Sequence, residues 1–269
     1  MLTFLNSGSR TCNLNHNPNH KFAMNHSMML YRRNALYSFI PKNGCSTLRL
    51  TTAIDNGCVK GIEQGHWIHA NNGTFNASLG EALQVNYAFV VLRCPFKRLA
   101  SVFLDKMVSK EPDAWQYRNA KGRQVELDDL TFKQFVRTLK EGPVLNSNIH
   151  WRKQTDFLLY DAYSDYFCLE AFDQAITTLQ DKLGLEVVDA RALTGHGTDR
   201  YQLVTDQSYA NTAAFDIATM KRAGQCPSHE ALYDEESYQI VADIYAKDIA
   251  LYNEKCTNGR LMQSEQVIT

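Results

Sequence analysis

The chain has 269 residues, of which 44% are hydrophobic, and a formal net charge of −1 at pH 7. This length and apolar content suffice for one domain with a sizeable core. The nearly balanced charge excludes a broad basic surface for nucleic acid or for an anionic membrane, so any anion-binding site must be built locally.

The seven cysteines are an odd set and contain no Cys-x-x-Cys pair. This pattern argues against a disulfide framework and against a zinc cluster, and it favours reduced thiols. The sequence has neither an apolar N-terminal segment of the signal-peptide type nor an apolar run of about 18 residues that could span a membrane. We therefore expect a cytoplasmic protein with no membrane span and no metal site.

Residues 1–30 are rich in Asn, His, Ser and Met. This composition is typical of a poorly ordered segment. We expect a flexible lead-in, followed by one domain that covers residues 31–269.

The first apolar run, residues 35–40, predicts a buried strand. The loop of residues 41–45 follows it. Ser46 or Thr47 is then expected to cap a helix that ends near residues 56–57, where glycine supplies a stop.

A second strand and helix follow in the same order. Residues 87–92 predict a strand, and Pro95 is well placed as the first residue of a helix that runs to about Ser109. The polar stretch of residues 111–129 is interpreted as a surface excursion, and Thr131 as the cap of a further helix.

Residues 166–169 predict another strand, and residues 172–183 a helix that Gly184 ends. A last amphipathic helix is expected over residues 235–253. Strands that alternate with helices indicate an α/β fold, with a single central parallel sheet flanked by helices on both faces.

The loop before the first long helix has the parts of an anion cradle. Lys42 supplies a point charge, Gly44 lets the backbone approach a ligand, and the helix N-terminus presents unpaired N–H groups. Ser46 and Thr47 add hydroxyl groups. The nucleotide triphosphatase loop, Gly-x-x-x-x-Gly-Lys-Ser/Thr, is absent. When this segment is considered by itself, an ordinary strand-to-helix turn is an equally good interpretation.

Arg93 follows the strand of residues 87–92. The carboxyl end of a strand is where open α/β sheets bind ligands, and a guanidinium suits a phosphate. Ser101, in the next helix, could share that anion. Taken alone, Arg93 is equally compatible with a structural role.

Together the two segments resemble the two phosphate-binding motifs of sulfotransferases. The resemblance is closest to the carbohydrate sulfotransferases related to the chondroitin and HNK-1 enzymes, sulfotransferase family 2. Their Pro-Lys-x-Gly/Ala-Cys/Ser-Ser/Thr loop corresponds to residues 41–46, and their Arg-Asp/His-Pro-Phe-x-Arg-Leu-x-Ser-Ala/Val-Phe/Tyr helix to residues 93–103. The family's His-Trp-x-Pro-Gln segment resembles residues 150–154, and its terminal helix resembles residues 245–252.

Two positions depart from the family pattern. Cys94 stands where many members have Asp or His, and Lys153 stands where Pro is expected. The luminal members also carry a membrane anchor, which this sequence lacks.

The resemblance implies a P-loop-like sulfotransferase fold and a metal-free reaction. The donor would be 3′-phosphoadenosine 5′-phosphosulfate (PAPS), and the product 3′-phosphoadenosine 5′-phosphate (PAP). The first motif would hold the 5′-phosphosulfate, with Lys42 also acting catalytically on the bridging oxygen. Arg93 and Ser101 would hold the 3′-phosphate, and the loop of residues 194–200 would lend Arg200 to the same group. The residues of the first motif are Pro41, Lys42, Asn43, Gly44, Cys45, Ser46 and Thr47.

The acceptor hydroxyl needs a general base, and a neutral imidazole can take a proton near neutral pH. By resemblance to heparan-type sulfotransferases, His66 is the first candidate and His69 the second. If their segment were a strand, the two side chains would face opposite sides. His150 is a third candidate, although its segment could instead brace the site, and structural histidines are the alternative for all three.

A carbohydrate is the acceptor that the resemblance implies, either a polysaccharide or a glycolipid, although another hydroxyl compound stays open. Peripheral membrane association is expected if the acceptor is a glycolipid. The segment of residues 111–129 could determine specificity. Sugar platforms could come from Trp67, Trp115 or Trp151, each of which could equally belong to the core.

Two other functions remain open. A nucleotide-dependent kinase also binds phosphate at a loop between a strand and a helix. The sequence, however, lacks the Gly-Lys-Ser/Thr residues that end the kinase loop, and it lacks an evident acidic metal ligand. A scaffold protein could have kept the fold and lost the chemistry.

Overall fold

The computed structural model describes residues 2–8, 13–71, 73–190, 198 and 200–267. The described residues fall into two compact units. Unit 1 takes its residues from Met1–Arg93, Gln154–Gly195 and Glu254–Gly259, and unit 2 from Cys94–Lys153, His196–Asn253 and Arg260–Thr269. The first motif and Arg93 therefore belong to unit 1, whereas Ser101 and Arg200 belong to unit 2. That residues 31–269 fold as one domain stays a prediction.

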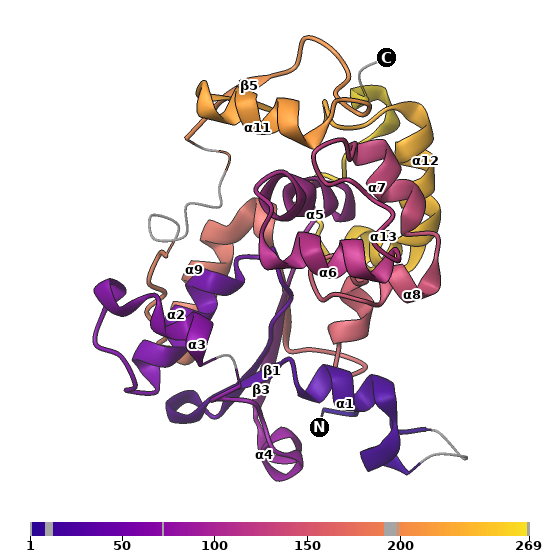
Figure 1. The fold of residues 1–269 in the computed structure, drawn as a ribbon. Helices are drawn as coiled ribbons and strands as arrows, with labels where there is room; N and C mark the ends of the chain where they lie inside the picture. The colour runs from indigo at the N-terminus through magenta and orange to yellow at the C-terminus, as the bar shows by residue number, and fades with distance from the viewer. Residues whose placement is uncertain (1, 9–12, 72, 191–197, 199, 268–269) are drawn as a thin grey trace. The chain divides into compact units, whose positions relative to one another are not determined.

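Figure 1 labels strands β1 and β3 of the central sheet of unit 1. Within the described residues this sheet has four strands in the order β1-β2-β3-β4. Their bounds are β1 Ser27–Leu30, β2 Ala35–Ser38, β3 Tyr87–Leu92 and β4 Asp165–Cys168. Strands β2, β3 and β4 are parallel, and β1 is antiparallel to β2. The three predicted strands are confirmed, and β1 adds an antiparallel edge that the sequence analysis did not predict.

Both faces of this sheet are buried. On one face Tyr37 and Phe89 stack with ring centroids 5.0 Å apart, and Phe167 meets Phe89 edge to face at 5.9 Å. This face belongs to the same core cluster as apolar residues of α2 and α9. On the other face Leu36 and Val90 are fully buried. The predicted sheet with two covered faces is thus confirmed.

The helices of unit 1 include the two that were expected. Their bounds are α1 Pro18–Met24, α2 Cys45–Asp55, α3 Trp67–Ala70, α4 Leu79–Gln84 and α9 Phe172–Leu183. Helix α9 has the predicted bounds, and Gly184 ends it with a left-handed φ of 60°. The N-cap of α2 is Gly44, so the helix begins at Cys45. Ser46 and Thr47, the expected caps, therefore lie inside its first turn.

The expected flexible lead-in instead contains regular structure. The Asn17 side chain caps α1 by accepting hydrogen bonds from the N–H groups of Asn19 and His20, and Pro18 takes the first helical position. All four residues of β1 are buried in the sheet. The asparagine-rich composition predicts disorder, and this prediction is wrong here because Asn17 caps a helix.

Unit 2 is mainly helical. Its elements are α5 Pro95–Val102, the π-helical turn η4 Phe103–Met107, α6 Pro112–Ala120, α7 Phe132–Thr138, α8 Gly142–Leu145, α11 Ala214–Arg222, α12 Glu235–Ile244, α13 Ala246–Lys255, and the parallel pair β5 Gln202–Val204 and β6 Gln225–Pro227. The last two residues of α13 belong to unit 1. Pro95 begins α5 and Thr131 caps α7 as predicted. In the part of the chain that is described, no helix is long and apolar enough to cross a membrane.

Two expectations for unit 2 were wrong. The stretch of residues 111–129 is not only a surface excursion, because α6 lies within it and buries Ala114 and Tyr117 completely. The expected single terminal helix is divided into α12 and α13 at Tyr245. The hydroxyl group of Tyr245 donates a hydrogen bond to the Trp151 carbonyl, which fixes this break within unit 2.

Candidate functional site

The loop between β2 and α2 has an unusual backbone. Lys42 and Gly44 both have left-handed conformations, with φ of 71° and 73°, and Asn43 between them does not. Such an alternation turns successive backbone N–H groups toward one concave side and forms an anion-binding nest. The Asn43 N–H is already used in a hydrogen bond to the Ile40 carbonyl at 3.2 Å, so this turn can offer an anion the N–H groups from Gly44 onward.

Gly44 is the residue that the loop can least replace. A Cβ atom there would lie 3.1 Å from Cδ1 of Leu169, and the positive φ would strain any L-residue. The absence of a side chain also leaves the N-terminus of α2 without a side-chain cap, and no acidic residue lies in its first turn. The helix end is thus positive and open to an anion.

The other residues of the motif differ in what they can offer. Among the described residues, the N–H groups of Cys45, Ser46 and Thr47 and the Ser46 hydroxyl group have no hydrogen-bond partner. The Thr47 hydroxyl group, in contrast, accepts a hydrogen bond from the Ala190 N–H at 3.2 Å. Cys45 packs against the core of unit 1. Ser46 therefore offers both a hydroxyl and an N–H group, and Thr47 chiefly its N–H.

A buried amide network ties this loop to the end of β3. Asn43, which is fully buried, donates from Nδ2 to the Val91 carbonyl at 2.8 Å and to Gln154 Oε1 at 2.6 Å. Gln154, only 1% exposed, accepts from the Arg93 N–H at 3.1 Å and donates to the Arg93 carbonyl at 2.9 Å. Two side chains thus fix the backbone on both sides of the cradle.

Arg93 and Lys42 are brought together within unit 1. The Arg93 guanidinium donates from Nη1 to the Lys42 carbonyl at 2.9 Å. This bond holds Lys42 in its left-handed conformation and places a fixed cation beside the loop. Gln154, which supports both Arg93 and the loop, has one signal in the sequence, the last position of the His-Trp-x-Pro-Gln resemblance.

The histidine candidates of unit 1 lie on a helical turn rather than a strand. His66 precedes α3 and His69 lies within it, both are exposed, and their ring centroids are 6.5 Å apart. The expectation for a strand, that they face opposite sides, therefore does not apply. Arg49 of α2 donates to the Ile68 carbonyl, so this turn is anchored on the helix that begins at the cradle.

The second motif is divided between the units. In unit 2, α5 carries Ser101, which is 9% exposed and has no side-chain hydrogen bond to a described residue. Arg98 of the same helix is buried and donates to the carbonyls of Arg152 and Ile149, at 2.8 and 3.2 Å. Arg98 thus holds the segment that contains His150.

His150 is held by a charged network in unit 2. Its Nδ1 lies 2.9 Å from Asp113 Oδ1 and 2.9 Å from Asn148 Oδ1, and Lys106 Nζ lies 3.6 Å from Asp113 Oδ2. Burial alone would raise the pKa of Asp113. The hydrogen bond and charge of His150, together with Asn148 and Lys106, outweigh burial and lower this pKa to about 2. These contacts fit the bracing role.

The loop that was expected to close over the nucleotide lies outside the described residues for the most part. Arg200 is described, is exposed and lies over the Tyr201 ring at 4.9 Å from its centroid. The three tryptophans differ sharply. Trp151 is fully buried and donates to the Val144 carbonyl, Trp67 packs against Phe75, and Trp115 is 48% exposed. Only Trp115 keeps the properties of a sugar platform.

Comparison with known proteins identifies the family of this chain. Neither the curated proteins nor the solved structures contain a significant match to this sequence. A model of the sulfotransferase family matches residues 25–253, which include both motifs, the histidine turn and most of the terminal helix. The match is to the family as a whole, so the chondroitin and HNK-1 subgroup stays a prediction. The chain belongs to the sulfotransferase family.

Proposed function

We propose that this sulfotransferase uses PAPS as the donor and transfers the sulfuryl group to a hydroxyl of a carbohydrate. Membership of the family implies PAPS-dependent sulfuryl transfer. The observation that supports this donor best is the cradle at Lys42–Gly44, with its two left-handed residues and its bond to Arg93. The kinase alternative lacks such support, because the sequence has no Gly-x-x-x-x-Gly-Lys-Ser/Thr loop.

The residues present fit an anionic donor. The cradle combines the open N-terminus of an eleven-residue helix, two cationic side chains and no acid in the first turn. Lys42, Ser46 and the N–H groups of residues 44–47 would hold the 5′-phosphosulfate. Arg93 would hold the 3′-phosphate, and contacts of Ser101 and Arg200 with the same group stay a prediction from the resemblance. When bound, PAPS supplies an activated sulfuryl group.

Charge stabilisation is the main contribution that this chain can make to the chemistry. Sulfuryl transfer resembles phosphoryl transfer, in which positioning and electrostatics dominate. With the donor bound, Lys42 would stabilise negative charge on the leaving group, and the N–H groups of the α2 N-terminus would stabilise charge on the sulfuryl oxygens. Loss of one such contact costs about 3 to 4 kcal/mol of barrier in comparable sites.

The acceptor hydroxyl must lose its proton, and we assign this step to His66, with His69 as the second candidate. Both imidazoles are exposed and lie on the turn that Arg49 anchors to α2. An exposed imidazole can take a proton near neutral pH and return it to water. His150 instead has its Nδ1 engaged by Asp113 and Asn148.

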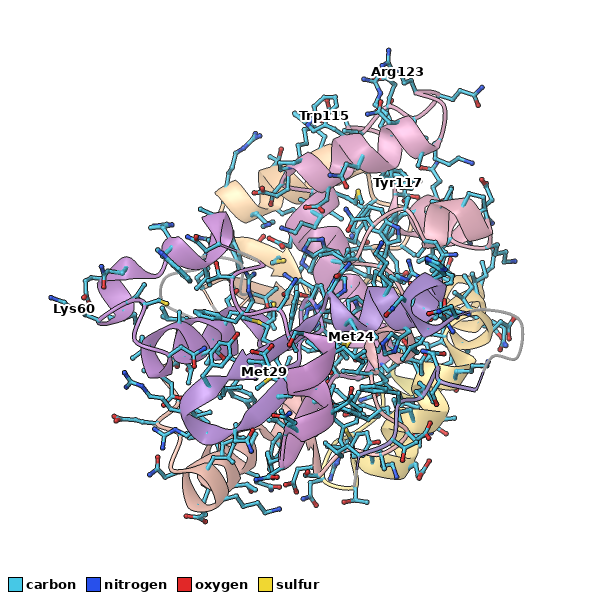
Figure 2. The ribbon with its side chains drawn as sticks, turned by 90° about the horizontal axis from the view of Figure 1, so that it is seen from below. Met24, Met29, Lys60, Trp115, Tyr117 and Arg123 are labelled. Atoms are coloured by element: carbon cyan, nitrogen blue, oxygen red, sulfur yellow. The ribbon has the colours of Figure 1, made fainter. Side chains whose placement is uncertain are left out.

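A carbohydrate acceptor is supported by Trp115. Figure 2 shows this side chain together with Arg123 on the surface around α6, and Arg118 lies over the indole at 5.8 Å. Pyranose rings pack their C–H faces on exposed indoles, and the neighbouring cations can donate to hydroxyl groups. Trp67 and Trp151 contribute to packing instead.

The test is metal-free transfer from PAPS to a panel of polysaccharides and glycolipids, with sulfated product and PAP measured by mass spectrometry. Lys42→Ala should abolish most of the transfer. Lys60→Ala is the matched control, since Lys60 is an exposed lysine of the same unit that Figure 2 places at the surface. Transfer to non-carbohydrate alcohols alone would overturn the acceptor class. Binding of PAP without any transfer would favour the scaffold alternative.

A further inference from the structure

Unit 2 contains a pocket of about 300 Å³. Of the residues assigned above to the donor or to catalysis, Arg200 alone is among its described lining residues. The walls of the pocket come from the turn after η4, from Asp128, from Arg200 and Tyr201, and from α11. On α11 the lining residues Phe215, Ala218 and Arg222 are spaced three and four positions apart. They therefore lie on one face of the helix, which is turned to the pocket.

Positive charge is concentrated around this pocket. Its ionisable lining consists of one carboxylate, Asp128, and four cations: Lys110, Arg200, Lys221 and Arg222. Asp128 pairs with Lys110. Within the described part of the chain, Arg200 and Arg222 form no ion pair, and Lys221 forms none directly, although the Asp105 carboxylate attracts it from nearby. The chain as a whole has a net charge of −1, so this excess is local.

The cations are held in place by neutral groups. Arg200 lies 4.9 Å from the Tyr201 ring centroid, and Arg222 lies 5.9 Å from that of Phe215. Lys221 donates to the Leu104 carbonyl at 2.9 Å and to the Ser109 hydroxyl group at 3.1 Å. Aromatic faces and carbonyls orient cations without neutralising their charge.

This arrangement is electrostatically unfavourable when no anion is bound. Burial is the main cause that lowers the pKa of Lys221; Cys226 and Asp105 oppose it in part, and repulsion from Arg200 adds a smaller effect in the same direction as burial. Like charges around a cavity destabilise the folded protein. Such destabilising arrangements are found most often at functional sites. An anion bound in the pocket would remove the repulsion.

Resting on the proposed function, we propose that this pocket binds an anionic group of the acceptor, a carboxylate or sulfate carried on a sugar ring. The volume lies at the lower end of ligand pockets, which fits one ring and its substituent better than a long chain. Phe215, 50% exposed, offers an apolar face to the ring. The guanidinium group of Arg222 offers paired donors to a planar carboxylate or to sulfate oxygens.

The 3′-phosphate of the donor has the same charge chemistry, and the resemblance predicts that Arg200 contacts it. The experiment therefore has one arm for each source. Calorimetry measures the binding of 4-nitrophenyl β-D-glucuronide, of its neutral counterpart 4-nitrophenyl β-D-glucoside, and of PAP to the whole chain. The variant is Arg222→Gln, because Arg222 is exposed and has no part in the donor cradle. Lys140→Gln, an exposed lysine of the same unit outside the pocket, is the control.

The wild-type chain should bind the glucuronide roughly tenfold more tightly than the glucoside, and Arg222→Gln should remove this preference, as loss of one charge-assisted hydrogen bond does. PAP affinity should not change in either variant. Equal binding of the two glycosides by the wild-type chain would overturn the proposal, and so would a weaker affinity for PAP in Arg222→Gln. Failure of PAP to bind the wild-type chain would refute the donor instead, while a glucuronide preference that needs Arg222 would still support the pocket.

Discussion

The carboxamide of Gln154 holds the backbone of Arg93 from both sides. Its Oε1 accepts the Arg93 N–H at 3.1 Å, and its Nε2 donates to the Arg93 carbonyl at 2.9 Å. The same Oε1 also accepts from Asn43 at 2.6 Å. One buried side chain therefore couples the end of β3, which carries a cation, to the loop that carries Lys42.

Replacement of Gln154 by Leu should damage the donor site more than its effect on stability explains. The change leaves the Arg93 backbone groups and the Asn43 amide without their partner, at a cost of about 1 to 3 kcal/mol for a buried polar group. The loss of PAP binding free energy should be at least as large as this cost, because Arg93 and Lys42 lose their alignment. Calorimetry at a temperature where the variant is folded measures this. Gln180→Leu, at an exposed position of α9, is the control. Full PAP affinity in folded Gln154→Leu would contradict the positioning role.

Gly44→Ala should destabilise the chain and disrupt the cradle. The left-handed φ of 73° and the 3.1 Å approach of a Cβ to Leu169 both oppose a side chain. A left-handed L-residue alone costs about 1 to 2 kcal/mol. Gly80→Ala is the matched control, since a Cβ there meets nothing within 4 Å and the residue lies in α4. Urea unfolding should show a loss for the first variant and none for the second. Equal midpoints would refute the account of this loop.

His66→Gln should lower kcat and leave PAP affinity intact. A general base contributes about 10²- to 10⁴-fold to such a reaction. His69→Gln and His150→Gln should have smaller effects on kcat, since His69 is the second candidate and the His150 ring is held by Asp113. Steady-state kinetics with a saturating acceptor distinguish the three. If His150→Gln alone abolishes turnover, the base has been assigned to the wrong histidine.

Asp113 should make the chain sensitive to acid. Its pKa in the folded protein is lowered to about 2 from an ordinary 3.8. A lowered carboxyl pKa stabilises the fold at pH values above the ordinary one, and this contribution is lost as the pH falls through the folded-state value. The shift corresponds to roughly 2 kcal/mol.

Urea unfolding of the wild-type chain between pH 7 and pH 2 should therefore show stability that declines below about pH 4. Asp113→Asn should be less stable at pH 7 and should decline less steeply with acid. Asp129→Asn, at an exposed position of the same unit, should follow the wild-type curve. Parallel curves for Asp113→Asn and the wild-type chain would show that the pair with His150 does not contribute.

The sequence predicted the elements whose signals are local. The apolar run of residues 87–92 became β3, and Pro95, Thr131 and Gly184 began or ended helices where their chemistry requires it. Helix α6 was missed because its polar surface hides the two residues that it buries, Ala114 and Tyr117.

The residues that form the cradle could be predicted from the sequence, whereas the residues that support it could not. The left-handed conformation of Lys42 is stabilised by Arg93, 51 residues away along the chain, and Gln154 is another 61 residues further on. Local sequence patterns do not predict contacts between residues so far apart in the chain. Similarly, the cations of the unit 2 pocket come from three separate segments, so their gathering is visible only in the fold.

The central claim is that the cradle at Lys42 binds a 3′-phosphoadenosine nucleotide, and metal-free calorimetry with PAP tests it most directly. We expect PAP to bind the wild-type chain and the Lys60→Ala control with the same affinity, and to bind Lys42→Ala and Arg93→Ala much more weakly. Adenosine triphosphate should bind more weakly than PAP, with or without magnesium. Absence of PAP binding, or tighter binding of adenosine triphosphate when magnesium is added, would contradict the claim.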